Sequence, residues 1–344
     1  MPDTLTTEAM APPEYVQVID MAKGHYVSMI VHAAARFALA DHLASGPKTA
    51  AELAGPTNTH APSLYRLMRT LASLGLLTED STHRFQLTSL GAALKTGAPG
   101  SARATILTIA GDWFWHGLEQ FPYSVQTGKS GFEKTFGMPV FDYLAQNPEK
   151  ASLFSETMIG IHGQEPAAVA EVYDFSDVSV LMDVGGASGN LLTTVLARHP
   201  GPRGILFDLP HVVTDAKPLI EARGLSDRIE IRGGSFFESV PSGADTYMLS
   251  HVIHDWSEEQ CLTILGHVRR VMPQNGRLLL VEMVLAHGDT PHPGKILDMI
   301  MLVGPGGQER TEDEYRELYK KAGFRLTRVV PTASPVSVVE GVPV

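Results

Sequence analysis

A glycine-rich turn and a downstream acid are the residues of this chain best suited to hold a nucleoside-containing cofactor. The turn runs from Gly185 to Gly189, directly after an apolar run that ends in Asp183 and Val184. Glycines let the backbone approach a ligand there, because they lack a Cβ and tolerate positive φ. Asp208 ends the next apolar run, 23 residues after Gly185, where a carboxylate accepts hydrogen bonds from ribose hydroxyls. The turn has neither the GxGxxG nor the phosphate-loop pattern, so the spacing predicts the kind of cofactor without identifying it.

A histidine and two acids form a second group that can do chemistry. His254 follows the apolar run 247–250 at the carboxyl end of a predicted strand, and Glu282 ends the later apolar run 278–282. In doubly wound sheets these strand ends face the ligand crevice, which places both residues on the edge that carries the glycine turn. Glu309 stands just before a predicted helix. A lone histidine is more often a core or surface residue, but we predict that the two acids orient His254, because a carboxylate on an apolar strand needs a partner.

The strands that position these residues are predicted in the region 171–344, where apolar runs alternate with helical segments. That alternation is typical of an α/β fold with a doubly wound, parallel sheet. The last two apolar runs flank a turn rich in proline, so they predict a terminal hairpin that adds an antiparallel strand. The expected strands are 179–184, 204–208, 228–232, 244–252 and 276–285, and those of the hairpin are 324–330 and 336–339.

Residues 1–100 predict a mainly helical domain. Residues 26–40 have helical periodicity, and two short helices followed by a small hairpin make a winged-helix pattern after them. Such a pattern binds DNA in some proteins. However, residues 47–95 hold only five Lys or Arg against three acids, which is no electrostatic footprint for nucleic acid. We therefore expect a structural, dimerising role for this domain.

Residues 101–170 predict a helical connecting region rich in large side chains, among them Trp113. Aromatic and methionine surfaces at a domain junction commonly line a pocket for a flat apolar ligand. Core packing between helices explains the same side chains nearly as well. Asp298, on the apolar helix of residues 297–302, is expected to face this pocket as well.

Composition bounds the function classes. The 344 residues carry a net charge of −11, which disfavours a sequence-independent grip on nucleic acid or on an anionic membrane. The one cysteine, Cys261, leaves no disulfide framework and suits a reducing compartment. Residues 1–13 have no signal-peptide pattern, and no apolar run approaches the length of a membrane span. We expect a cytoplasmic protein.

Five motifs together give the chain a specific resemblance. In order along the sequence they begin at Asp183 (DVGG), Phe207 (FDLP), Gly233 (GGSFF), His254 (HDWS) and Gly306 (GGQERT). Their order and spacing resemble the small-molecule O-methyltransferases of the caffeic acid type and their bacterial natural-product relatives. The resemblance covers nearly the whole chain. It implies a Rossmann-like methyltransferase domain, a winged-helix-like dimerisation domain, a homodimer, and S-adenosylmethionine as cofactor without a metal.

The resemblance also implies roles for individual residues. His254 matches the general base of the family, and Glu282 and Glu309 match its supporting acids. The cofactor is expected at Asp183, Gly185, Gly186, Asp208, Leu209, Ser235, Phe236 and Ser250, with the ribose at Asp208 and the adenine at Ser235-Phe236. Met158 and His162 match the segment that lines the acceptor pocket.

The chain departs from the family pattern at four positions. Ala187 replaces the third glycine of the turn, and Ser235 replaces an aspartate that contacts adenine. Ser250 stands where plant members carry lysine, and His251 stands where they carry an aromatic residue. The base and its acids are unaffected by these changes.

The function predicted in this way is transfer of a methyl group to a hydroxyl, most simply a phenol, of a small aromatic or polyketide-like metabolite. One alternative keeps the fold and the cofactor, but the reaction is a hydroxylation, a decarboxylation or a pericyclic step. A second is a regulator in which the winged-helix region binds DNA, which the acidic balance disfavours. Retention of His254, Glu282 and Glu309 favours methyl transfer.

Overall fold

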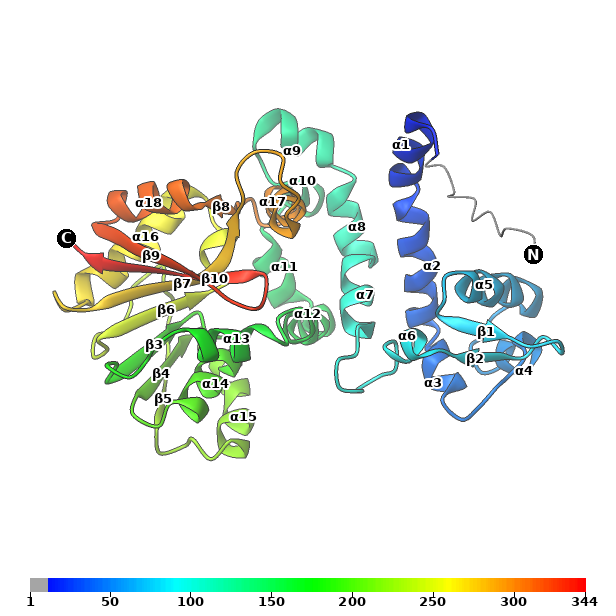
Figure 1. Cartoon of the computed structure of the whole chain (residues 1–344), viewed down its shortest axis with the longest axis horizontal. Coiled ribbons are helices and arrows are strands. Elements are labelled where there is room, and N and C mark those ends of the chain that lie inside the picture. The colour runs from blue at the N-terminus through cyan, green and yellow to red at the C-terminus, as the bar shows by residue number, and fades with distance from the viewer. Residues whose placement is uncertain (1–11) are drawn as a thin grey trace, which may run out of the picture. The chain divides into compact units, whose positions relative to one another are not determined.

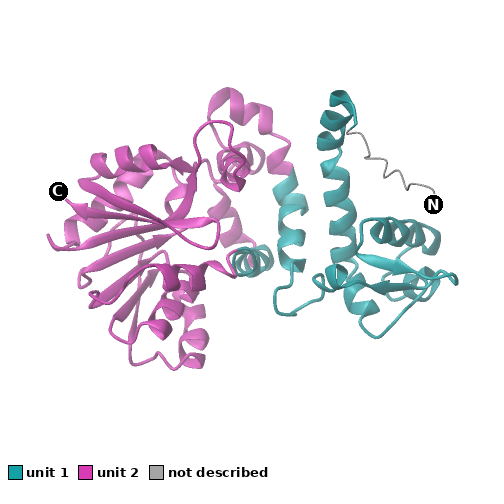
Figure 2. Cartoon of the chain, viewed as in Figure 1, with its two compact units in different colours: residues 1–115, 149–161 teal, residues 116–148, 162–344 magenta. Residues whose placement is uncertain are grey.

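The computed structural model of the chain describes residues 12–344, which divide into two compact units (Figure 2). Unit 1 holds the residues up to Trp115 together with Glu149–Ile161, and unit 2 holds His116–Pro148 and His162–Val344. The helices of 101–170 are thus shared between the units, and the division expected at residues 100 and 170 stays a prediction. The expectation of no signal peptide falls mostly on residues 1–11, which lie outside the described residues.

Unit 1 contains the predicted winged-helix pattern, in which the helix pair α4–α5 is followed by the two-stranded sheet β1–β2. The helical run predicted for 26–40 is interrupted, because Ala38 has a left-handed φ of 49° between α2 and α3. The elements are α1 Glu14–Ala22, α2 Gly24–Arg36, α3 Leu39–Leu43, α4 Ala50–Ala54, α5 Ala61–Ser73, β1 Leu77–Glu79, β2 Phe85–Leu87, α6 Ser89–Ala92, α7 Arg103–Ile109 and α12 Pro148–Ile161, with α8 Asp112–Leu118 crossing into unit 2.

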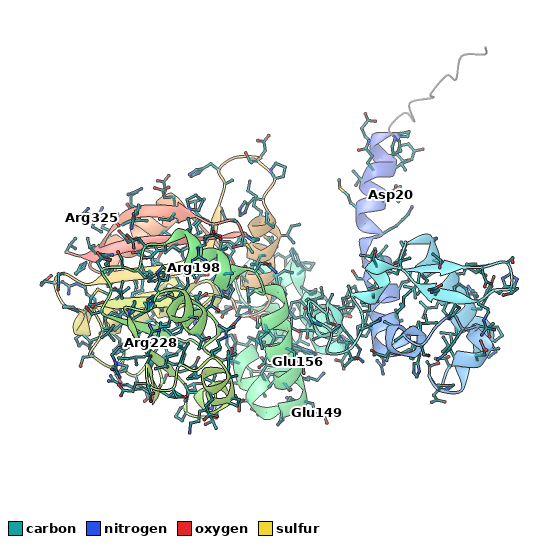
Figure 3. All side chains as sticks on the ribbon, turned by 60° about the horizontal axis from the view of Figure 1, so that its bottom comes forward. Asp20, Glu149, Glu156, Arg198, Arg228 and Arg325 are labelled. Carbon is teal, nitrogen blue, oxygen red and sulfur yellow. The ribbon has the colours of Figure 1, made fainter. Side chains whose placement is uncertain are left out.

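An apolar surface on α1 and α2 is left uncovered within unit 1. None of the α1 residues is buried, and Asp20, labelled in Figure 3, makes only a surface ion pair with Lys23. The exposed apolar side chains of the two helices are Tyr15, Val18, Ile19, Met21, Tyr26, Val27 and Met29. Large apolar side chains left exposed in this number on two consecutive helices are consistent with an interface.

Unit 2 is built on a twisted sheet with the strand order β5-β4-β3-β6-β7-β10-β9, to which β8 adds by pairing with β7 (Figure 1). The strands β3 to β7 are parallel, and the terminal hairpin joins them through the antiparallel pairing of β10 with β7. The strands are β3 Val180–Val184, β4 Arg203–Asp208, β5 Ile229–Gly233, β6 Thr246–Ser250, β7 Arg277–Leu285, β8 Arg310–Thr311, β9 Phe324–Pro331 and β10 Val336–Pro343. The doubly wound sheet and its hairpin are confirmed.

Helices cover both faces of this sheet, as Figure 1 shows. One buried cluster joins alternate strand residues such as Met182 and Leu280 to α16 and α18, and the other joins Leu181 and Leu279 to α13, α14 and α15. This two-faced burial explains why the parallel strands are continuous apolar runs. The helices of unit 2 are α9 Phe121–Thr127, α10 Gly131–Phe136, α11 Val140–Gln146, α13 Glu165–Val172, α14 Asn190–Arg198, α15 Lys217–Ala222, α16 Glu258–Val271, α17 Pro293–Val303 and α18 Glu312–Lys321, with short 3-10 turns η1 Val213–Ala216 and η2 Ile253–Asp255.

The strand order reverses at β3, because β4 lies on one side of it and β6 on the other. Ligands of open α/β sheets bind outside the carboxyl ends of the strands at such a switch point. The glycine turn follows β3, and the segment with His254 follows β6. The sheet therefore brings the two groups singled out in the sequence to adjacent strand ends.

Candidate active site

Glu282 fixes the backbone that carries His254. Its side chain is fully buried on β7, and Oε1 accepts hydrogen bonds from the N–H groups of Val252 (3.1 Å) and Ile253 (2.9 Å). Those two N–H groups belong to the turn between β6 and α16, so the Glu282 carboxylate holds this turn in place. The second oxygen, Oε2, lies 3.5 Å from His254 Nδ1. The predicted pairing of Glu282 with His254 is thus present in the structure.

Glu309 makes the shortest contact with the histidine. Its Oε1 lies 2.7 Å from His254 Nδ1, and both side chains are buried. When Nδ1 donates this hydrogen bond, the imidazole keeps its lone pair on Nε2. The segment that carries Glu309 is itself held, because the Gln308 N–H donates to the His254 carbonyl (2.9 Å) and the Glu309 N–H donates to Asp298 Oδ1 (2.9 Å).

Gly307 allows this segment to approach the His254 backbone. A Cβ at Gly307 would overlap the carbonyl oxygen of His254 and the backbone of Asp255. No side chain fits between the two segments, so glycine is required for Glu309 to reach the imidazole.

The neighbouring acids favour the protonated form of His254. Burial lowers the pKa of the imidazole, but the charges of Glu282, Asp255 and Glu309 outweigh it and raise that pKa to about 10. Burial raises the pKa of Glu282 to about 7 against the opposing charge of His254. Asp255, whose Oδ1 lies 3.7 Å from His254 Nε2, has its pKa raised to about 6 by burial. Strongly shifted pKa values of neighbouring buried groups are typical of a functional site.

The glycine turn has the shape of a cofactor cradle. Gly185 has a φ of 74°, and a Cβ there would lie 2.8 Å from Val252 Cγ2. Ala187, the residue at the family's third glycine, has a left-handed φ of 47° and so keeps the course of the turn. Gly189 is the N-cap of α14 and provides no side-chain cap, which leaves first-turn N–H groups for a ligand. These residues fit a nucleoside cofactor that carries an anionic group.

Asp208, at the end of β4, connects that strand end to the glycine turn after β3. Its Oδ2 accepts from the Ala187 N–H (2.9 Å) and its Oδ1 accepts from the Leu209 N–H (2.6 Å). Each carboxylate oxygen has two lone pairs, so each can accept one more hydrogen bond. Burial raises the pKa of Asp208, and burial together with the charge of Asp208 raises the pKa of Asp183 to about 7. Asp183 lies beneath the turn and is 1% exposed.

The other predicted cofactor residues lie at neighbouring strand ends. Leu209 is exposed after β4, Ser250 is half-buried at the end of β6, and Ser235 and Phe236 are half-buried after β5. Ser235 Oγ accepts from the Phe237 N–H (3.3 Å), and the Phe236 ring packs against Phe237 with centroids 4.9 Å apart. A contact of these residues with the cofactor stays a prediction.

The predicted acceptor residues fall in different units. Trp113 and Met158 belong to unit 1, where Trp113 is buried and packs against Phe154 with ring centroids 6.4 Å apart. His162 and Asp298 belong to unit 2. Asp298 accepts from the Glu309 backbone, a positioning contact that its place on an apolar helix did not reveal. A pocket shared by all four residues stays a prediction.

Two features of the site were not predicted from the sequence. Asp255 faces His254 Nε2, and only its adjacency to the histidine in the HDWS motif pointed to it. Glu165 Oε2 lies within hydrogen-bonding distance of both His162 and His251. Across residues 12–344, two groups bring possible metal-ligand atoms within 4.8 Å of one another: His162, Glu165 and His251, and His251, His254 and Glu282.

Comparisons with known proteins identify both parts of the chain. Residues 115–325 match the model of an O-methyltransferase domain, and residues 19–97 match that of an O-methyltransferase dimerisation domain. The phenazine O-methyltransferase PhzM of Lysobacter antibioticus is 41% identical over 99% of this chain and 100% of its own length. No helix within residues 12–344 has both the length and the apolar character needed to cross a membrane.

Two further similarities bear on ligand and reaction. A crystal structure of the O-methyltransferase NcsB1 from neocarzinostatin biosynthesis, in complex with S-adenosylmethionine and 2-hydroxy-5-methyl naphthoic acid, is 32% identical with a TM-score of 0.81. It covers 92% of this chain and 96% of its own. The aclacinomycin 10-hydroxylase RdmB of Streptomyces purpurascens is 34% identical over 87% of this chain and 81% of its own length.

Gly307→Ala tests whether the close approach positions Glu309. We expect a loss of stability of about 1–3 kcal/mol, as for other overpacking changes, together with a fall in activity, because the segment must move away from His254. Gly266→Ala is the matched control, since a Cβ at that helical glycine meets nothing within 4 Å. Urea unfolding measures the stability of both variants, and a methyl-transfer assay measures their activity. Equal stability of Gly307→Ala and the wild type would contradict the packing account.

Proposed function

The chain belongs to the S-adenosylmethionine-dependent O-methyltransferase family, and we propose that His254 is the general base with which it deprotonates its acceptor. The enzyme transfers a methyl group to a small aromatic metabolite. The observation that carries the proposal is the buried contact of His254 Nδ1 with Glu309, 2.7 Å long. It directs Nε2, the other ring nitrogen, toward a proton of the acceptor.

A phenol has a pKa of about 10, so little phenolate exists at neutral pH. As the oxygen attacks, His254 Nε2 takes the hydroxyl proton and the imidazole becomes imidazolium. The acids around His254 raise its pKa to about 10, so the unprotonated form that accepts the proton becomes more populated as the pH rises. Glu282 and Glu309 stabilise the imidazolium that forms.

S-adenosylmethionine, when bound, supplies an electrophilic methyl carbon on a sulfonium, and transfer leaves neutral S-adenosylhomocysteine. We assign its binding to the turn at Gly185 and Gly186 over Asp183, with the ribose at Asp208 and Leu209 and the adenine at Ser235 and Phe236. Ser250 completes this set. The support is the cradle formed by Gly185 and the uncapped first turn of α14.

The acceptor is proposed to be a phenolic or polyketide-like ring that contacts Trp113, Met158, His162 and Asp298. NcsB1, a relative that binds a naphthoic acid, supports a flat aromatic acceptor. Methyl transfer itself is proposed to need no metal, because His254 and its acids supply the base that the reaction requires. We also infer a cytoplasmic location, which the buried free thiol of Cys261 supports.

We propose that the enzyme is a homodimer joined through its N-terminal helices. Residues 19–97 match the dimerisation domain of the family, and α1 and α2 leave their apolar side chains uncovered within unit 1. Burial of such side chains against a second copy contributes about 25 cal/mol for each Å² removed from water.

A non-methylating reaction is the second candidate, because a relative named as a hydroxylase is 34% identical over 87% of this chain. The presence of His254, Glu282 and Glu309 favours methyl transfer, because a base and its supporting acids are what deprotonation of an acceptor hydroxyl requires. Formation of one S-adenosylhomocysteine per product distinguishes the two reactions.

His254→Ala should lower the rate of methyl transfer by roughly 10²–10⁴-fold at neutral pH and leave S-adenosylmethionine affinity nearly unchanged. The loss should become smaller as the pH approaches the pKa of the phenol, because the phenol then ionises in solvent without the help of His254. For the wild type, whose acids raise the pKa of His254, kcat/KM should rise with pH as Nε2 becomes unprotonated. Rates measured across pH check both expectations.

His287→Ala is the control for this variant, because His287 is a surface histidine with 70% of its side chain exposed. It should retain the wild-type rate at every pH. Full activity of His254→Ala at neutral pH would show that the histidine is structural and would reject the proposed base.

The dimer is tested by placing charge on the uncovered helix. Val18→Asp combined with Met21→Asp, at side chains that are 65% and 79% exposed, should convert a dimer into a monomer in light scattering. Val125→Asp, at a 61% exposed position on α9, should leave the dimer intact. A wild-type protein with the mass of one chain would refute the proposal.

A further inference from the structure

Beside His254 lies a second cluster of titratable side chains, formed by His162, Glu165 and His251, of which only His162 is proposed to contact the acceptor. Glu165 Oε2 lies 2.8 Å from His162 Nδ1 and 2.7 Å from His251 Nε2. The two imidazole rings pack together with centroids 3.8 Å apart. All three residues belong to unit 2, where Glu165 opens α13 and His251 follows β6. Three donor atoms thus converge from two segments that are distant in the sequence.

We propose that His162, Glu165 and His251 form a binding site for a divalent transition-metal cation of the Zn²⁺ class. Two imidazoles and one carboxylate are the protein ligands of many zinc sites that leave a fourth position open. Nitrogen donors favour Zn²⁺ and its neighbours over Mg²⁺ and Ca²⁺, which prefer oxygen. The ligand atoms lie within 4.8 Å of one another, so small side-chain shifts bring them into one coordination sphere.

The cluster is built into the fold and yet open at one end. The side chains of Glu165 and His251 are 8% and 12% exposed, whereas that of His162 is 21% exposed and gives the cation a way in.

An unpartnered pair of buried atoms supports the site independently. His251 Nδ1 and Glu282 Oε2 are both buried, and neither has a hydrogen-bond partner in the part of the chain that the structure describes. Histidines that bind metal through one ring nitrogen commonly donate the other N–H to a carboxylate. When His251 Nε2 binds the cation, its proton moves to Nδ1, which can then donate toward Glu282, directly or through a water. When His162 Nδ1 binds the cation, its proton likewise moves to the other ring nitrogen, Nε2.

The metal should act on the neighbouring base. The His251 and His254 rings lie 5.2 Å apart, so a cation at His251 opposes the positive charge that His254 acquires during methyl transfer. Metal binding should therefore inhibit the enzyme reversibly, and chelation should restore its rate. The site itself does not depend on the proposed reaction, because binding is measured without turnover.

Titration of the metal-free full-length protein with Zn²⁺ in a calorimeter tests the site, and Co²⁺ reports the ligand geometry through its visible absorption. One cation should bind per chain. His162→Gln and Glu165→Gln should each weaken binding at least tenfold, whereas His287→Gln should match the wild type. His162→Gln is the informative variant, because its side chain is the most exposed of the three at 21% and can change without unfolding the protein. Circular dichroism checks that the variant is folded.

Two results would overturn the proposal. One is Zn²⁺ affinity that is the same in folded His162→Gln and in the wild type, including the case in which neither binds. The other is an affinity that falls in His254→Gln and not in His162→Gln, which would place the cation on His251, His254 and Glu282 instead. Failure of His254→Ala to lose activity leaves these measurements unaffected, so the two proposals fail separately.

Discussion

The buried hydrogen bond between His254 Nδ1 and Glu309 Oε1 is the interaction on which the rest of the site depends. It orders one imidazole tautomer, and it requires two segments 55 residues apart to meet without a side chain between them. Asp298 holds the Glu309 backbone and Glu282 holds the turn on the other side. A carboxylate buried at this depth is stable only when such partners are present, so the site and the local fold stabilise each other.

The sheet places this pair where a ligand must come. Because the strand order reverses beside β3, the turn at Gly185 and the segment after β6 lie at adjacent carboxyl ends. Val252, whose N–H is capped by Glu282, is also the residue that a side chain at Gly185 would strike. One short segment therefore limits the cofactor turn on one side and carries the proposed base on the other. A substitution that moves this segment should therefore affect both the cofactor turn and His254.

The features predicted from the sequence are those set by local chemistry. Continuous apolar runs gave the parallel strands, since both faces of the sheet are buried, and a glycine turn after the first of them located the switch point. His254 follows a strand and Glu309 stands close to a helix start, whereas Glu282, expected at the end of its strand, lies three residues before the end of β7. Only the topology of the sheet brings these three positions together. The cluster of His162, Glu165 and His251 was not predicted. His251 itself has a left-handed φ of 52°, and the residue that it contacts, Glu165, lies 86 positions earlier in the sequence. Likewise, an apolar helix does not reveal that Asp298 turns toward a backbone N–H.

The central claim is that Glu309 holds His254 with its proton on Nδ1 and leaves Nε2 to the acceptor. Nuclear magnetic resonance of the protein labelled with ¹⁵N at histidine measures this directly, in the complex with S-adenosylhomocysteine and a phenol. The account predicts a protonated Nδ1 throughout the titration, with Nε2 alone gaining and losing a proton, and loss of this pattern in Glu309→Gln. A neutral His254 that carries its proton on Nε2 would contradict the account, because that tautomer cannot accept the proton of a phenol.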